Sequence, residues 1–126
     1  MELIGAGRSL LIYPDTDSKP HVWFVLTDPV GMPGKVVAVM IQSAKPYTDS
    51  TVLLEHGDHP FIRHQTSVSF GQATFFTLEK LQRYFQKGMC HLLQDMSAAL
   101  LDKVRKGLLA SARTPHSIRA YCQSQF

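Results

Sequence analysis

The feature that most constrains the fold is a change of hydrophobic period near Thr77. Before it, short β-branched and aromatic runs alternate with clusters of Pro, Gly and Asp, a pattern typical of strands joined by turns. After it, apolar residues recur every three or four positions, as on one face of a helix. A run of strands followed by helices predicts an α+β fold. We expect residues 1–126 to form a single domain, because this length suits one hydrophobic core.

The strand-like part, about residues 8–76, is predicted to form a small, strongly curved, mostly antiparallel β-barrel of the SH3-like kind. Its most regular strand is KVVAVMIQ, residues 35–42. This segment is apolar on both faces, which predicts a central position in the sheet. Several short strands at close spacing, with turn clusters between them, are typical of a small barrel.

Two helices are predicted in the last third of the chain. The first covers residues 78–87, with Thr77 as its N-cap. The second covers residues 91–110, where a buried stripe is predicted. The stripe consists of Leu93, Met96, Leu100, Val104 and Leu108. Because proline interrupts a helix, Pro115 predicts that residues 112–126 form a loose tail.

Charge and cysteine content narrow the function classes. Residues 1–75 carry a net charge of −2 and residues 76–126 a net charge of +5. The basic part could contact nucleic acid or an acidic partner, or could be an ordinary solvated helix face. Cys90 and Cys122 are too few for a disulfide framework. The longest apolar run is too short for a bilayer, so we expect a cytoplasmic protein with no membrane contact.

Half of the six histidines lie in one polar segment, LLEHGDHPFIRHQTSVSF, at His56, His59 and His64. Such a cluster could bind a metal, carry protons, or be a histidine-rich loop without chemistry. The spacing matches no strong zinc signature and does not lie on a predicted helix. We therefore predict neither a metal nor a cofactor.

Three stretches resemble motifs of the MazF/PemK-like toxins, small ribonucleases of toxin–antitoxin systems. HVWFVLT (21–27) resembles their RPxLVLS strand, and VVAVMIQS (36–43) resembles their central strand ending in ITS. VSFGQATFFTLEKL (68–81) is similar to the late stretch that leads into their helices. The resemblance covers about residues 8–108. It implies a PemK-like barrel, an RNA substrate, a homodimer and a small acidic antitoxin protein as partner.

Two departures from the family pattern concern residues that help to bind and cleave the RNA backbone. His21 stands where the family has the arginine of its RP strand, and Gln42 stands in place of the threonine of ITS, whereas Ser43 is kept. Either other side chains carry the chemistry, or the domain binds nucleic acid or a peptide without cutting. The resemblance thus leaves an endoribonuclease and a non-enzymatic binding module as the two function classes.

Metal-independent RNA cleavage needs a base, an acid and cationic groups near the phosphate. Histidine and arginine suit these roles, so we predict His21, His59, His64 and Arg63 as catalytic residues. The predicted substrate-binding residues are Gln42, Ser43, Thr66 and Ser67. We expect His21, Gln42, Ser43 and the loop 58–67 to face one cleft.

Each histidine also has a structural interpretation. His59 precedes a proline, which holds it extended, as in many ordinary loops. Strand alternation would put His64 on the same side as Ile62, so it could equally be a hydrogen-bonded core residue. The partners of the ring nitrogens should distinguish these roles. Trp23 and Phe24 are expected to be core residues rather than a platform for bases.

Overall fold

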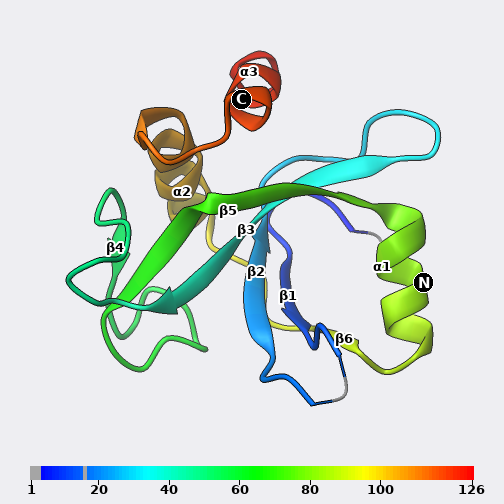
Figure 1. The fold of residues 1–126 in the computed structure, drawn as a ribbon, viewed down its shortest axis with the longest axis horizontal. Helices are drawn as coiled ribbons and strands as arrows, with labels where there is room; N and C mark the ends of the chain where they lie inside the picture. Colours follow the sequence, from blue (N-terminus) through cyan, green and yellow to red (C-terminus); the bar gives the residue numbers. More distant parts are fainter. Residues whose placement is uncertain (1–3, 16) are drawn as a thin grey trace.

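The computed structural model describes residues 4–15 and 17–126. Within them the chain forms one six-stranded antiparallel sheet and three helices (Figure 1). The strands are β1 (Ser9–Ile12), β2 (His21–Val25), β3 (Lys35–Ser43), β4 (Leu53–Leu54), β5 (Thr66–Thr77) and β6 (Cys90–Leu92). The helices are α1 (Leu78–Gln86), α2 (Ala98–Ala110) and α3 (His116–Gln125). The strand order is β4-β5-β3-β2-β1-β6, which confirms the α+β prediction and the central place of residues 35–42.

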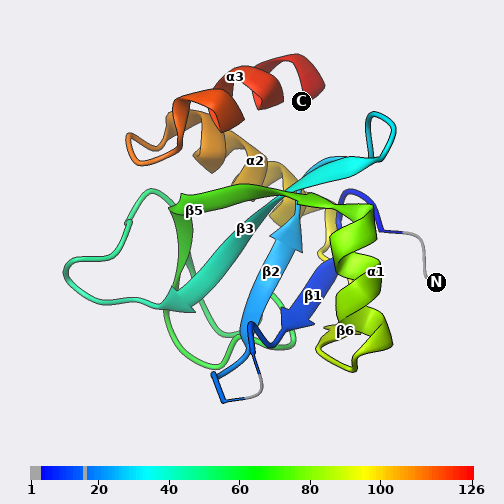
Figure 2. The ribbon, with the colours of Figure 1, turned by 45° about the vertical axis from the view of Figure 1, so that its right-hand side comes forward.

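The sheet stays open, so the predicted barrel is not confirmed. The short strands β4 and β6 lie at opposite edges. The physical reason is that β4 pairs with β5 and β6 pairs with β1, so no ladder joins the two edges. Both faces of the open sheet are buried. Alternation along β2 directs Val22 and Phe24 into a core with α2 and α3, and Val25 into a separate core with Leu81 of α1. Figure 2 shows α1 on one side of the sheet and α2 and α3 on the other.

The first helix agrees with the sequence, and its cap explains why. The Thr77 hydroxyl accepts a hydrogen bond from the Lys80 amide at 3.1 Å, which satisfies one of the unpaired amides of the first turn. Helix α1 ends at Gln86, one residue before the predicted end. This boundary lies within the ordinary uncertainty of helix ends.

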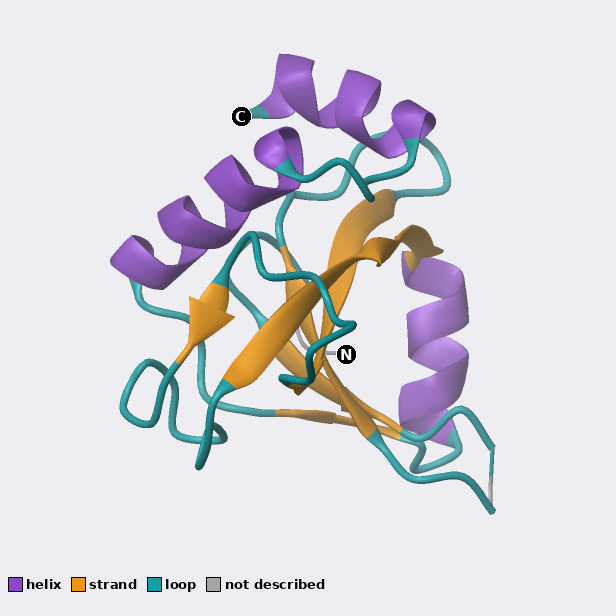
Figure 3. Ribbon diagram, turned by 60° about the vertical axis from the view of Figure 1, so that its left-hand side comes forward, coloured by secondary structure: helices purple, strands orange, loops and turns teal. Residues whose placement is uncertain are grey.

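The predicted helix 91–110 is wrong in its first part. Residues Cys90–Leu92 form β6, which pairs with β1. Helix α2 begins only at Ala98, where the Ser97 hydroxyl accepts from the Leu100 amide at 3.1 Å. The open edge of β1 offers ladder partners to residues 90–92, so tertiary pairing overrides the local helical period. Figure 3 shows this short edge strand and the loop that leads from it to α2.

The predicted loose tail, residues 112–126, is also wrong. Most of it forms α3, with Pro115 as its N-cap. A proline at the start of a helix removes no internal hydrogen bond, because the first amides have no helical partner. Ile118 and Cys122 lie one turn apart and are buried, so α3 packs into the same core as α2. Burial raises the pKa of the Cys122 thiol to about 11.

Among residues 4–15 and 17–126, none of the helices has the length and hydrophobicity that a membrane span requires.

A buried polar cluster ties the loop after β3 to the connection between α2 and α3. Asp49 is 5% exposed and accepts hydrogen bonds from the Ser111 hydroxyl at 2.6 Å and the Thr51 amide at 2.8 Å. Burial alone would raise the pKa of Asp49. The hydrogen bonds from Ser111 and Thr51, with the charge of Arg113, nevertheless hold this pKa below the ordinary 3.8.

We expect Asp49→Asn to lower the free energy of unfolding at pH 7 by about 1.5–3 kcal/mol, the usual range for hydrogen bonds to a charged group. A lowered pKa stabilises the fold at pH values above the ordinary pKa and loses this effect as pH falls through the folded value. The difference between parent and variant should therefore shrink from pH 7 to pH 3. Urea unfolding at several pH values measures it, with the exposed Asp17→Asn as control. A difference that is constant with pH would contradict the prediction.

Candidate functional site

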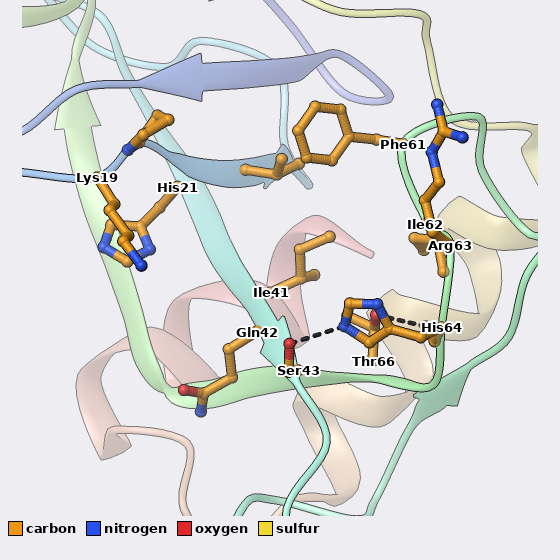
Figure 4. Close-up of a pocket in the computed structure, with 12 residues that line it drawn as sticks. Lys19, His21, Ile41, Gln42, Ser43, Phe61, Ile62, Arg63, His64 and Thr66 are labelled. Atoms are coloured by element: carbon orange, nitrogen blue, oxygen red, sulfur yellow. Dashed lines mark hydrogen bonds between the residues drawn. The ribbon is translucent and has the colours of Figure 1, made fainter.

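A pocket of about 300 Å³ opens where strands β2 and β3 separate from each other. The pairing of β2 with β3 stops at Trp23 and Met40. Beyond that point β2 continues beside β1 as far as His21, and β3 continues beside β5 as far as Ser43. The two central strands therefore diverge, and the loop before β5 covers the opening. Figure 4 shows the side chains that line the pocket from these segments.

The pocket gathers six of the eight predicted site residues from distant parts of the sequence. They are His21, Gln42, Ser43, Arg63, His64 and Thr66. Alternation along β3 directs Ile41 and Ser43 to one face of the sheet and Gln42 to the other. His21 and Gln42 therefore line one side of the division, and Ser43 and His64 line the other, as Figure 4 shows.

Ser43 and His64 form the central contact of the pocket. The Ser43 Oγ lies 2.7 Å from the His64 Nε2, and both residues are exposed. The alternative that His64 is a core residue is therefore wrong. It assumed that strand alternation extends back to Ile62, whereas β5 begins only at Thr66. The buried Thr66 donates its hydroxyl to the His64 carbonyl at 2.8 Å, so it supports the backbone of His64.

His59 has the structural role that the sequence left open. It is 3% exposed and is absent from the residues that line the pocket. Its Nδ1 accepts from the Phe61 amide at 3.1 Å, so the neutral ring carries its proton on Nε2. Nε2 then donates to the Gln94 carbonyl at 2.7 Å and lies 3.2 Å from the Ser9 hydroxyl. Both ring nitrogens of His59 are hydrogen-bonded to protein groups. We therefore assign His59 a core role in place of the predicted catalytic role.

Ser67 also departs from its predicted role. It is fully buried, and its hydroxyl donates to Thr48 Oγ1 at 2.8 Å. It therefore joins the loop after β3 to β5 and does not face the pocket. The prediction failed because the loop that covers Ser67 follows β3 and is distant in sequence from β5.

Two further residues of the pocket, Lys19 and Phe61, were not among the predicted site residues. Phe61 is 47% exposed, which is unusual for a phenylalanine in a folded domain. The available signal was its position after Pro60 in a polar loop, and for Lys19 its place two residues before His21. Lys19 and Arg63 are the cationic lining residues. No carboxylate occurs among the described residues that line the pocket, so its charge suits an anion.

The histidine segment does not assemble a metal centre in the described part of the chain. There, no three His, Cys, Asp or Glu side chains come together in a way that could hold a metal ion. His56, Asp58 and His59 do line one surface pocket of about 420 Å³, but both ring nitrogens of His59 contact protein groups.

Comparison with known proteins reveals a similarity to a solved structure. No family model and no curated protein matches the sequence. Among solved structures, an endoribonuclease in complex with its cognate antitoxin from Mycobacterial species matches with a TM-score of 0.56 and 15% identity, covering 91% of this chain and 98% of that one. The similarity is one of fold. At the level of the fold, it agrees with the resemblance to toxin endoribonucleases that the sequence motifs predicted.

Proposed function

We propose that this protein is a metal-independent endoribonuclease of a toxin–antitoxin system. The single observation that carries the proposal is the Ser43–His64 pair in one pocket with His21 and two cations. These are the residue types that RNA cleavage through the 2′-hydroxyl requires. The fold shared with a known endoribonuclease supports the same assignment.

The proposed reaction divides the proton transfers between two histidines. One imidazole removes the proton from the 2′-hydroxyl, whose oxygen attacks the neighbouring phosphorus. The bond from phosphorus to the 5′-oxygen breaks, and the second imidazole protonates that oxygen. The products are a 2′,3′-cyclic phosphate and a 5′-hydroxyl. His64 and His21 line the two sides of the pocket and take these roles.

Ser43 and the cations complete the proposed site. A serine hydroxyl can donate to a neutral imidazole or accept from a protonated one, so the Ser43–His64 contact can hold the ring in both states. Arg63 and Lys19 would stabilise the negative charge on the phosphorus oxygens. They would thus replace the charge that is lost where His21 stands for the family's arginine. Gln42 would hydrogen-bond the phosphate.

Binding partners follow from the same proposal. RNA would be the substrate, a small acidic protein would be the antitoxin, and the active form would be a cytoplasmic homodimer. A second candidate function is a module that binds RNA or a peptide without cutting. It is favoured by the departures at His21 and Gln42 and by the apolar part of the pocket lining, Val22, Ile41 and Ile62.

The test is cleavage of end-labelled single-stranded RNA by the purified protein in excess EDTA. We expect fragments that end in a 2′,3′-cyclic phosphate, and no cleavage of the same strand made with 2′-deoxyribose, which lacks the nucleophile. Loss of cleavage in EDTA that zinc restores would contradict the metal-independent mechanism. RNA that is bound and never cut by antitoxin-free protein would leave only the binding module.

A further inference from the structure

A second pocket, of about 340 Å³, adjoins the first, because His21 lines both. It lies on the side of the sheet that α1 covers. Along β2, His21 and Trp23 lie two residues apart and therefore on the same face. Phe76 at the end of β5 and Tyr84 of α1 complete an aromatic lining.

The aromatic rings and one cation of this second pocket are held in place by contacts with one another. The rings of Trp23 and Phe76 are edge to face, with centroids 5.0 Å apart. The Lys80 ammonium lies 5.7 Å from the centroid of Phe76 and 5.8 Å from that of Tyr84. Trp23 and Tyr84 are half-buried and Lys80 is exposed. Flat apolar surface and a positive charge are therefore available side by side.

The charge of the two pockets favours a nucleic acid as occupant. Their described lining residues include Lys19, Arg63 and Lys80 and no carboxylate. Gln72 adds an amide that can donate to and accept from the edge of a base. Aromatic rings beside cationic side chains are the usual means of holding single-stranded nucleic acid.

We propose that the second pocket binds a nucleotide of the same RNA strand, next to the nucleotides that occupy the first pocket. Its base stacks on Tyr84, and Lys80 contacts its phosphate. This inference rests on the proposed function. Continuity at His21 favours RNA over an acidic peptide as occupant, because a strand that crosses the first pocket has to leave it on one side or the other.

The experiment uses binding of 2′-O-methyl RNA, which has no free 2′-hydroxyl and is not cut. Fluorescently labelled mixed-sequence strands of two and of eight nucleotides are titrated against parent, Tyr84→Leu and Lys80→Gln. Stacking is worth about 1–3 kcal/mol per base, so Tyr84→Leu should weaken binding of the longer strand about 5- to 150-fold. Binding of the dinucleotide, which the first pocket can hold alone, should change less than twofold.

Matched controls separate this site from general effects. Lys87→Gln removes an equivalent exposed charge at the other end of α1, outside the second pocket, and should leave both affinities within twofold. Lys80 is exposed and contributes only its backbone amide to the helix cap, so the Lys80→Gln variant should fold normally. Its affinity for the longer strand should be severalfold lower than that of the parent. Equal losses for both lengths, or unchanged binding of the longer strand, would overturn the proposal.

The outcomes distinguish this inference from the proposed function. If the parent cuts RNA and the second-pocket variants bind and cut as the parent does, the subsite is wrong and the enzyme remains. If the parent never cuts RNA but the second-pocket variants lose affinity for the longer strand only, the subsite is supported. It then belongs to a module that binds RNA without cutting it. Normal RNA binding by the variants together with lost binding of an acidic antitoxin peptide would assign the second pocket to a protein partner and overturn the RNA subsite.

Discussion

His64→Ala is expected to slow RNA cleavage by about 10²–10⁴-fold, the usual contribution of one positioned acid or base. RNA affinity should change only a few fold, because a proton carrier acts mainly in the transition state. The exposed position of His64 predicts a melting temperature close to that of the parent. Single-turnover cleavage, equilibrium binding and thermal unfolding measure the three quantities on the same preparation.

Two companion variants sharpen this test. His116→Ala removes an exposed histidine of α3 that does not line the pocket, and it should cleave like the parent. Arg63→Ala should weaken both binding and cleavage, and the loss in affinity should shrink at high salt. Normal cleavage by His64→Ala would remove this residue from the mechanism.

His59→Ala should have the opposite profile, with a free energy of unfolding lower by about 2–4 kcal/mol. The change removes a buried ring that packs against Phe24, with centroids 5.5 Å apart. It also leaves the Gln94 carbonyl without its hydrogen-bond donor. A lost hydrogen bond and a lost buried side chain both destabilise the folded state. Chemical unfolding measures the difference.

The neighbouring exposed histidine provides the control for this prediction. His56→Ala should change the free energy of unfolding by no more than about 0.5 kcal/mol, as is usual for surface positions. Well below its melting temperature, His59→Ala should still cleave RNA at a rate close to the parent's per folded molecule. A variant of His59 with parental stability and no cleavage would restore its predicted catalytic role.

Several properties of this protein follow from the sequence alone because they depend on neighbours along the chain. The change of period at Thr77 separates strands from helix, and the Thr77 cap fixes where α1 begins. The apolar segment 35–42 lies at the centre of the sheet because only a position covered on both faces can bury such a strand. The short motifs around residues 21–27, 36–43 and 68–81 predicted a resemblance to toxin endoribonucleases, and a solved endoribonuclease shares this fold. The closed barrel that the same resemblance implied is not confirmed.

The tertiary structure decided which histidine is buried and which is exposed. His59 and His64 lie five residues apart in one polar segment, and no local pattern separates them. His59 is in the core because Ser9 and Gln94, 50 and 35 positions away along the chain, contact its ring. His64 lines the pocket because β2 and β3 diverge beside it and Ser43 reaches its ring. Burial of a loop residue depends on segments that fold over it, and a single sequence does not specify which segments those are.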